Sequence, residues 1–289
     1  MKVVVAGGTG YIGKALVASF LADGHEVVAV TRDPGGTTSA ARLCAWDEVA
    51  GEIDGADTVV NLAGVPIGGR RWTDQRKEAI RSSRVDTTRD LVTAIEAAAA
   101  RPRVLVTASG IDYYGDSGNE LVDETSKPGR SVLAGVCVAW EAAAEPAPVR
   151  RVAVRTALVV GRGALAIRLT AVPFRLFAGG PLGNGRQYFP WVHLDDLVRI
   201  YRLAIDDQSL SGPVNAVAPQ QLRQREAGKD FGAVLHRPSI LPAPALGLRL
   251  LLGEQADLLL HGQRAVSARL TALDFRYSVL RAALEDALG

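Results

Sequence analysis

Three glycines near the N-terminus, at the spacing G-x-G-x-x-G, are the residues of this chain most clearly arranged for chemistry. Gly8, Gly10 and Gly13 lie between the apolar run VVVA and a helical pattern. At such a turn glycine lets the backbone approach an anion closely, and the helix N-terminus directs its amides at the same place. The pattern predicts a turn that binds the pyrophosphate of a dinucleotide; the alternative is a Gly-rich turn without a ligand.

The end of the next apolar run, EVVAVTR, predicts which dinucleotide binds. An acidic residue here accepts hydrogen bonds from the ribose of NAD, whereas an arginine suits the 2′-phosphate of NADP. Thr31 and Arg32 precede Asp33, and the guanidinium of Arg32 can hold a phosphate by its planar fork. We therefore expect NADP(H) as the cofactor, with NAD bound through Asp33 as the alternative.

A parallel sheet is expected to position these residues. Apolar runs without alternation, each followed by a helical pattern, are typical of strands that are covered on both faces. The expected strands are 2–7, 26–32, 42–47, 57–64, 103–110 and 151–161, and the expected helices are 13–24, 73–100 and 131–145. The sequence predicts an α/β fold with a Rossmann-like, doubly wound parallel sheet.

The second half of the chain has a different character, with Gly- and Pro-rich loops between short elements. We expect an NADP-binding domain over residues 1–160, with some later segments interleaved. A smaller C-terminal substrate-side lobe is expected over 161–289, including a helical region at about 238–289. Charged residues interrupt the apolar segment 246–262, which predicts an amphipathic core helix there and not a membrane span.

Composition excludes several classes of protein. The 289 residues are 48% hydrophobic and 22% charged, as in a globular protein with a large core, and the net charge of +2 argues against a nucleic-acid binder. Two cysteines and four histidines show no metal-ligand spacing, so we expect no metal site. Without a signal-peptide pattern, we expect a cytoplasmic protein with a small-molecule substrate, no membrane partner, and a homodimer as an option.

Several longer motifs extend the pattern along the chain. They are GGTGYIG (7–13), NLAG (61–64), YYGD (113–116), GGPLGNGRQYFPWVHLDD (179–196) and HRPSILPAP (236–244). With these motifs the sequence resembles the atypical or extended short-chain dehydrogenases/reductases, and within them the uncharacterised "epimerase family" group of NAD(P)-dependent epimerase-like proteins. The resemblance covers nearly the whole chain. It implies a Rossmann-like domain that binds NADP(H) and a C-terminal region that encloses a substrate.

The resemblance also implies which residues contact the cofactor. Those of the Gly-rich turn are Gly7, Thr9, Gly10, Tyr11, Ile12 and Gly13. Those expected at the 2′-phosphate are Thr31 and Arg32. Those expected beside the adenine and its ribose are Asp47, Leu62, Ala63 and Gly64, and those near the nicotinamide are Ala157 and Leu158.

Enzymes of the wider superfamily exchange the substrate proton through a Tyr and a Lys four residues apart, while a Ser polarises the carbonyl. Ser109 matches that Ser; its alternative role is a turn hydroxyl that satisfies the backbone. The helix 131–145 carries Leu133 and Cys137 at the Tyr and Lys positions. Leucine cannot exchange a proton, and a thiol on a buried helix usually behaves as a small hydrophobe. The usual proton-transfer pair is therefore missing.

The loop after Ser109 supplies the remaining candidates, Asp112, Tyr113 and Tyr114. A phenol is a poor base at neutral pH but an acceptable acid, which favours reduction of a carbonyl over oxidation of an alcohol. The alternatives are that the tyrosines only line the cleft and that Asp112 points to solvent. Arg84 replaces the superfamily's Asn and could hold the cofactor or offset the missing Lys charge; its alternative is an ion pair on the helix surface.

Residues of both halves are expected to meet the substrate. Arg71, with Arg70 and Trp72 beside it, could bind a carboxylate or phosphate, and Gln187 and Trp191 would close over it. In the adjacent segment we expect Asp195 to cap the following helix and His193 to be a packing residue.

The sequence thus predicts an NADP(H)-dependent oxidoreductase that reduces a carbonyl or enone of a small organic substrate. Two alternatives stay open. One is an NADP(H)-binding sensor or interaction protein without turnover. The other is a non-redox dehydratase or cyclase that reuses the cleft.

Overall fold

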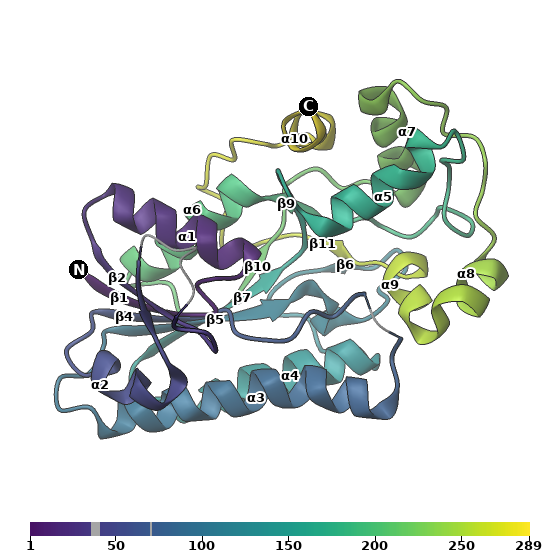
Figure 1. Cartoon of the computed structure of the whole chain (residues 1–289). Helices are drawn as coiled ribbons and strands as arrows, with labels where there is room; N and C mark the ends of the chain where they lie inside the picture. Colours follow the sequence, from purple (N-terminus) through teal and green to yellow (C-terminus); the bar gives the residue numbers. More distant parts are fainter. Residues whose placement is uncertain (36–40, 70) are drawn as a thin grey trace.

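The computed structural model describes residues 1–35, 41–69 and 71–289. Its centre is a parallel sheet of seven strands in the order β10-β7-β5-β4-β1-β2-β3 (Figure 1). The strands are β1 (Lys2–Ala6), β2 (Glu26–Val30), β3 (Arg42–Cys44), β4 (Thr58–Asn61), β5 (Val104–Gly110), β7 (Arg150–Thr156) and β10 (Gly212–Ala216). This architecture confirms the predicted α/β class and its Rossmann-like sheet.

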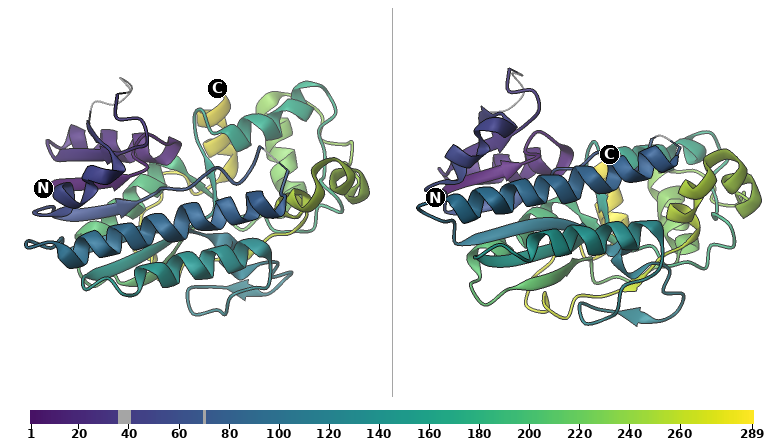
Figure 2. Two further views of the ribbon diagram at one scale, coloured as in Figure 1. Left: turned by 60° about the horizontal axis from the view of Figure 1, so that its bottom comes forward. Right: turned by 90° about the horizontal axis from the view of Figure 1, so that it is seen from below.

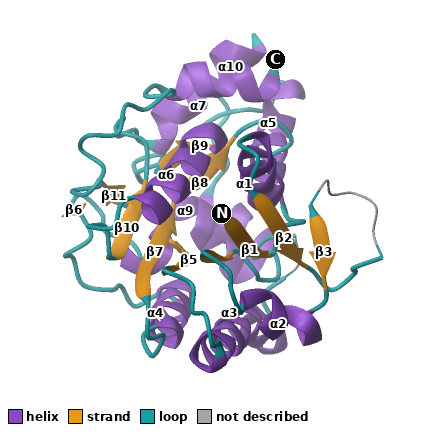
Figure 3. Ribbon diagram, turned by 90° about the vertical axis from the view of Figure 1, so that its left-hand side faces the viewer, coloured by secondary structure: helices purple, strands orange, loops and turns teal. Residues whose placement is uncertain are grey.

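Helices cover both faces of the sheet, which makes it doubly wound as predicted (Figures 1, 2 and 3). One face carries α1 (Tyr11–Ala22) and α6 (Leu194–Asp206), and the other carries α2 (Val49–Ile53), α3 (Asp74–Ala97) and α4 (Val132–Ala144). Successive side chains of a strand point to opposite faces. Val3 and Val5 therefore join the core under α1, whereas Val4 joins the core under α3. This burial on both sides explains the apolar runs without alternation.

The strand order reverses between β1 and β4. The chain runs outward from β1 through β2 to β3, and then crosses to β4 and continues in the opposite direction. Ala6 of β1 and Asn61 of β4 are paired in register, so their carboxyl ends lie side by side. In open α/β sheets, ligands bind in the crevice at such a switch point.

A smaller lobe lies at one end of the molecule (Figure 1). Its helices are α5 (Leu165–Arg175), α7 (Gln224–Leu235), α8 (Ala245–Leu252), α9 (Asp257–Leu260) and α10 (Leu280–Leu288). Its strands β8 (Leu158–Val160) and β9 (Trp191–His193) form a small sheet. A second small sheet, β6 (Leu121–Val122) with β11 (Arg264–Ala265), packs on the main core instead, which Val122 and Ala265 join. A separate core that includes Phe174, Trp191, Phe231 and Leu280 holds most of this lobe together. By contrast α6 and β10, although later than residue 160 in sequence, belong to the main sheet and its covering layer.

The segment 246–262 is not the core helix that the sequence predicts. Gly253, with a φ of +61°, ends α8, and the 3-10 turn η3 (Gly253–Ala256) separates α8 from α9. Leu246, Leu250 and Leu251 of α8 are more than 70% exposed. The prediction is wrong because apolar periodicity can show that a helix has an apolar face, but tertiary contacts decide whether anything covers it.

The single strand predicted at 151–161 divides into β7 and β8. Up to Thr156 the chain pairs within the main sheet, and the Ala157 amide still donates to the Ala216 carbonyl. The Leu158 amide donates instead to the Pro190 carbonyl, and β8 continues beside β9. Ala157 is therefore the point at which the chain leaves the main sheet for the smaller lobe.

The Gly-rich turn explains how α1 packs so closely on β1. Gly7 has a φ of +77°, which favours glycine. A Cβ at Gly13 would collide with the Gly7 carbonyl oxygen and would stand only 2.7 Å from the Gly8 Cα. Because any larger side chain at Gly13 would push the first turn of α1 off this loop, glycine is the residue that fits there.

Replacing Gly13 by alanine is expected to lower the free energy of unfolding by about 1–3 kcal/mol, because the added Cβ overpacks the turn. Gly135→Ala is the control: it lies within α4, nothing lies within 4 Å of its added Cβ, and it should gain about 0.5–1 kcal/mol from helix propensity. Urea unfolding followed by circular dichroism measures both. A Gly13→Ala protein as stable as the wild type would contradict the packing argument.

Candidate functional site

The N-terminus of α1 lies at the switch point, and its first amides have no hydrogen-bond partner in the described part of the chain. Gly10 is its N-cap residue and provides no side-chain cap, while the Gly8 and Gly10 amides bond back to the turn itself. The amides of Tyr11 and Ile12 form no hydrogen bond with the described residues. Free first-turn amides and the positive end of the helix dipole together suit an anion.

The other predicted cofactor residues lie along the same edge of the sheet. Leu62, Ala63 and Gly64 follow β4, and a Cβ at Gly7 would stand 2.9 Å from the Leu62 carbonyl carbon. Thr31 follows β2, with its Oγ1 3.5 Å from Thr9 Oγ1. These groups surround the turn closely enough for one extended dinucleotide to touch them all.

The groups expected at the 2′-phosphate, and Asp47, which is expected beside the adenine and its ribose, lie at the outer part of this edge. Arg32 is exposed, and it has no hydrogen-bond or ion-pair partner among the described residues. The Asp33 amide donates to Thr31 Oγ1 over 3.3 Å, which orients the loop after β2. Asp47 is exposed in the 3-10 turn η1 (Trp46–Glu48) after β3. A guanidinium that is unpaired among the described residues is available to a phosphate here.

Ser109 lies at the carboxyl end of β5 and is buried. Its Oγ is 2.7 Å from Glu141 Oε1, a residue of α4 that the sequence reading did not single out. The Glu141 carboxylate also accepts two hydrogen bonds from Arg155 of β7, each 2.8 Å long, from Nε and Nη2. A carboxylate that accepts from a guanidinium at both oxygens has no proton to give, so Ser109 is the donor in its bond to Glu141.

Arg155 connects this pair to both tyrosines of η2 (Ile111–Tyr114). Its guanidinium carbon is 3.4 Å from the centre of the Tyr113 ring, and its Nη1 donates to the Tyr114 hydroxyl over 2.8 Å. Tyr114 in turn donates to Asn215 Oδ1 over 2.8 Å. Burial raises the pKa of Tyr114 to about 12. The Tyr114 proton is thus fixed in the core, whereas Tyr113 is only half-buried.

Asp112 and Cys137 flank the same strand end. A Cβ built on Gly110 would lie 3.5 Å from Asp112 Oδ2 and 3.4 Å from Cys137 Sγ. Burial raises the pKa of the Asp112 carboxyl to about 6. Burial and the neighbouring Asp112 charge raise the pKa of the Cys137 thiol to about 12. Cys137 is therefore a protonated thiol at neutral pH, and Asp112 is a carboxyl that can exchange a proton near neutrality.

Arg84 is buried and supports the turn after β4. Its Nη1 donates to the carbonyls of Ile80 and Val65, over 2.9 and 3.2 Å, and its guanidinium stacks on Trp140. Burial lowers the pKa of this guanidinium. The alternative of a surface ion pair is wrong, because Asp86 pairs with Arg89 instead.

The residues expected at the substrate divide into two groups. Arg71 Nη2 donates to the Leu250 carbonyl of α8, and Gln187 Nε2 donates to the Leu259 carbonyl of α9. Both side chains therefore fasten the smaller lobe. Trp191 is fully buried in the lobe's core, and its Nε1 lacks a partner among the described residues. Arg70 lies outside the described residues.

The cap of α6 differs from the expectation. His193 Nδ1 accepts a hydrogen bond from the Asp195 amide and is the N-cap, so the prediction that Asp195 caps this helix is wrong. Asp195 instead forms an ion pair with Arg276. The His193 ring is buried and packs against Tyr277, with 3.7 Å between ring centres.

Glu141, Arg155 and Asn215 are the functional candidates that sequence reasoning missed. Two signals were available. Glu141 is one helical turn beyond Cys137, on the face that should carry the missing pair. Arg155 places a charge between the apolar residues 152–154 and 157–160, and a charge in such a position needs a buried partner.

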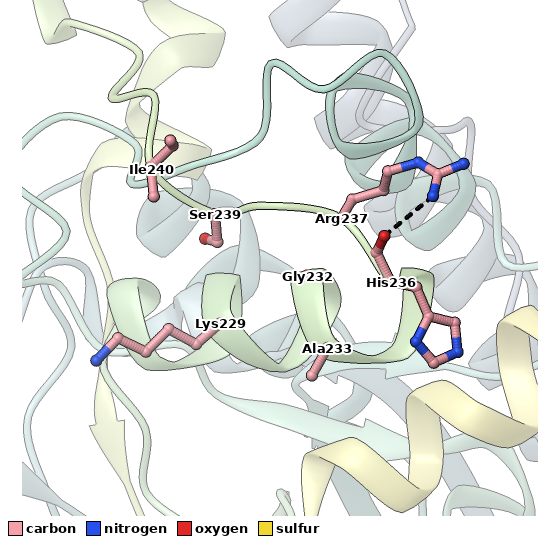
Figure 4. A pocket seen from close by; sticks show the side chains of 7 residues that line it. All are labelled: Lys229, Gly232, Ala233, His236, Arg237, Ser239 and Ile240. Carbon is pink, nitrogen blue, oxygen red and sulfur yellow. Dashed lines mark hydrogen bonds between the residues drawn. The ribbon is translucent and has the colours of Figure 1, made fainter.

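Other features of the described residues do not point to a second functional site. A hollow of about 560 Å³ lies between α7 and the segment that follows it (Figure 4). None of its lining residues is a predicted site residue, and the Arg237 side chain there donates to the neighbouring His236 carbonyl and lies over the Phe177 ring. Within the described chain, His, Cys, Asp and Glu do not gather into a metal-binding group, and no helix could span a membrane.

Known proteins resemble the chain over its whole length. The sequence profile of the NAD dependent epimerase/dehydratase family matches residues 3–216, and that of a domain of unknown function (DUF1731) matches residues 243–287. The chain is 39% identical to the mouse epimerase family protein SDR39U1, with all of both chains covered. It is 32% identical to the epimerase family protein YfhF of Bacillus subtilis, covering 100% of this chain and 98% of that one.

Solved structures agree with this similarity. The crystal structure of human epimerase family protein SDR39U1 (isoform2) with NADPH has a TM-score of 0.92 at 37% identity, covering 99% of this chain and 98% of the other. UDP-glucose 4-epimerase of Thermotoga maritima shares the fold, with a TM-score of 0.78 at 15% identity and coverage of 99% and 96%.

The raised pKa of Asp112 predicts a pH dependence of stability. The folded protein holds this proton more tightly than the unfolded chain, so its contribution is full below about pH 4 and is lost as the pH rises through about 6. The free energy of unfolding of Asp112→Asn minus that of wild type should therefore increase by about 2 kcal/mol as the pH rises from 4 to 7.5. Urea unfolding at several pH values measures it, with Asp116→Asn in the same loop as the control. A difference independent of pH would contradict the prediction.

Proposed function

Because the chain belongs to the NAD dependent epimerase/dehydratase family, we propose that it is an NADP(H)-dependent oxidoreductase that reduces a carbonyl or enone of a small organic substrate. One observation carries this proposal. The free amides at the N-terminus of α1 and the group formed by Ser109, Asp112 and Tyr113 lie along the same edge of the sheet. A dinucleotide anchored at the first would extend toward the second.

The residues around the Gly-rich turn fit the cofactor. Gly7 and Gly13 leave no room for a Cβ, so the backbone itself forms the surface that a pyrophosphate would touch. Arg32, exposed beside Thr31, would pair with a 2′-phosphate. The human relative, at 37% identity, was crystallised with NADPH. When bound, this cofactor supplies the hydride that a reduction needs.

The chain's own residues must hold the substrate and deliver one proton to its oxygen. Ser109 would hold the substrate at the end of β5. Asp112 and Tyr113 would supply the proton, because both are only partly buried and the Asp112 carboxyl has a pKa of about 6. Tyr114 is less suited, since its proton is donated to Asn215 in the core. The proton would then be replaced from solvent.

The cofactor preference can be tested at Arg32. Loss of a charge-assisted bond to the 2′-phosphate is worth about 1.5–3 kcal/mol, so Arg32→Ala should weaken NADPH binding by about 10- to 100-fold and leave NADH binding unchanged. Fluorescence titration measures both affinities. Arg89→Ala, on the exposed face of α3, is the control. Equal affinities for NADPH and NADH, with no effect of Arg32→Ala, would mean that the NADP assignment is wrong.

The reaction is tested by following the hydride. The protein is given 4-deuterated NADPH and a panel of ketones and enones, and deuterium in the product is measured by mass spectrometry. Transfer should fall by about 10²- to 10⁴-fold in Asp112→Asn or Tyr113→Phe if that residue supplies the proton. Tyr188→Phe, in the smaller lobe, is the control for the loss of a phenol.

Two other results would favour the alternatives. Tight NADPH binding without transfer to any substrate would indicate a binding protein without turnover. Substrate rearrangement without label uptake or cofactor oxidation would indicate a non-redox dehydratase or cyclase.

A further inference from the structure

We propose that Ser109 meets the substrate as a hydrogen-bond acceptor, and that the site therefore takes carbonyl compounds with a hydroxyl on the neighbouring carbon. This inference rests on the proposed function and specifies its substrate class. Its basis is a chain of buried hydrogen bonds in which the direction of each proton is fixed. The chain runs from Ser109 through Glu141, Arg155 and Tyr114 to Asn215.

Arg155 sets these directions because a guanidinium has five donors and no acceptor. Toward Glu141 it donates from Nε and Nη2, so both carboxylate oxygens accept. Toward Tyr114 it donates from Nη1, so the phenol must use its own proton elsewhere, at Asn215 Oδ1. The Asn215 amide nitrogen then donates to the Val266 carbonyl over 2.8 Å.

Ser109 ends this chain on the substrate side. A serine hydroxyl has one proton and two lone pairs, and its proton is committed to Glu141 over 2.7 Å. To donate to a substrate carbonyl, Ser109 would have to leave a charged acceptor that is itself mostly buried, 16% exposed. Hydrogen bonds to charged groups are among the stronger ones in proteins. Ser109 therefore offers a lone pair, and a substrate group that contacts it must donate.

The surroundings place the reacting carbonyl next to that donor. Gly110 follows Ser109 directly, and a Cβ built on Gly110 would lie 3.4 Å from Cys137 Sγ and 3.5 Å from Asp112 Oδ2. Ser109, as acceptor, and Asp112, as proton donor, are three residues apart and lie on the two sides of Gly110 in sequence, with the Asp112 carboxyl close to that glycine. A ligand with a hydroxyl and a carbonyl on adjacent carbons can satisfy both residues at once. Its hydroxyl donates to Ser109, and its carbonyl oxygen accepts from Asp112.

The test compares two ketones of nearly equal shape, hydroxyacetone and 2-butanone, in which a methyl replaces the hydroxyl. Dissociation constants are measured by saturation-transfer NMR on the NADP⁺-loaded protein, and turnover is measured with NADPH. Wild type should prefer hydroxyacetone by about tenfold or more in both, as expected for one well-placed hydrogen bond. Ser109→Ala should bring the two ketones to within about threefold.

Glu141→Gln tests the origin of the preference. A glutamine amide can donate to Ser109, which frees the serine proton for the ligand and should reduce the preference for hydroxyacetone. The control is Glu145→Gln, which makes the same change one turn later, at the exposed C-cap of α4. This variant should retain the preference for hydroxyacetone. Circular dichroism spectra and melting temperatures of all variants show whether each one is folded.

The outcomes separate this inference from the proposed function. A binding preference that depends on Ser109, without turnover of either ketone, supports the inference and counts against the reductase. Turnover with equal preference, or a preference that survives in Ser109→Ala, overturns the inference and leaves the reductase standing. Neither binding preference nor turnover overturns both.

Discussion

The permanent charge of Arg155, held at 3% exposure inside the protein, is the constraint on which the rest of the site depends. A buried guanidinium is tolerated only if it is paired and hydrogen-bonded, since leaving it unpaired costs several kcal/mol. Here Glu141 balances the charge, the Tyr113 ring lies under it, and Tyr114 accepts its remaining bond. One side chain of β7 thereby fixes α4 and the loop after β5 relative to each other.

The same pairing explains how the fold accommodates the loss of the superfamily's Tyr and Lys. The face of α4 that would carry them presents Leu133, Cys137 and Glu141, one turn apart. The first two are buried without a charge, and the third is neutralised by Arg155. In the proposed reaction, proton exchange is assigned to the groups at the half-buried edge of this cluster, Asp112 and Tyr113. The Gly-rich turn matches the family, whereas the polar cluster around Ser109 is organised by a cation from another strand, Arg155.

The two halves of the site differ in how much of their geometry is local. The cofactor half is made by a turn and a helix start that follow each other directly, and its glycines are fixed by clashes within a few residues. The NADPH in the human relative is the cofactor that the sequence predicts. The substrate half is made by residues from β5, α4, β7 and β10, which only the order of strands in the sheet brings together.

The sequence by itself determined the parallel sheet, its helices and the Gly-rich turn, because each depends on residue patterns within one segment. It also indicated Ser109 and the loop of Asp112 and Tyr113, since the carboxyl ends of parallel strands meet at one edge. Only the tertiary structure decided the partners of those groups. The Ser109 proton is directed by Glu141, 32 residues away, and Tyr114 is bound to Asn215, 101 residues away. Likewise, the exposed leucines of α8 and the buried Arg84 follow from what packs against each helix. Direction of a proton and burial of a side chain are properties of contacts between segments, and no single segment encodes them.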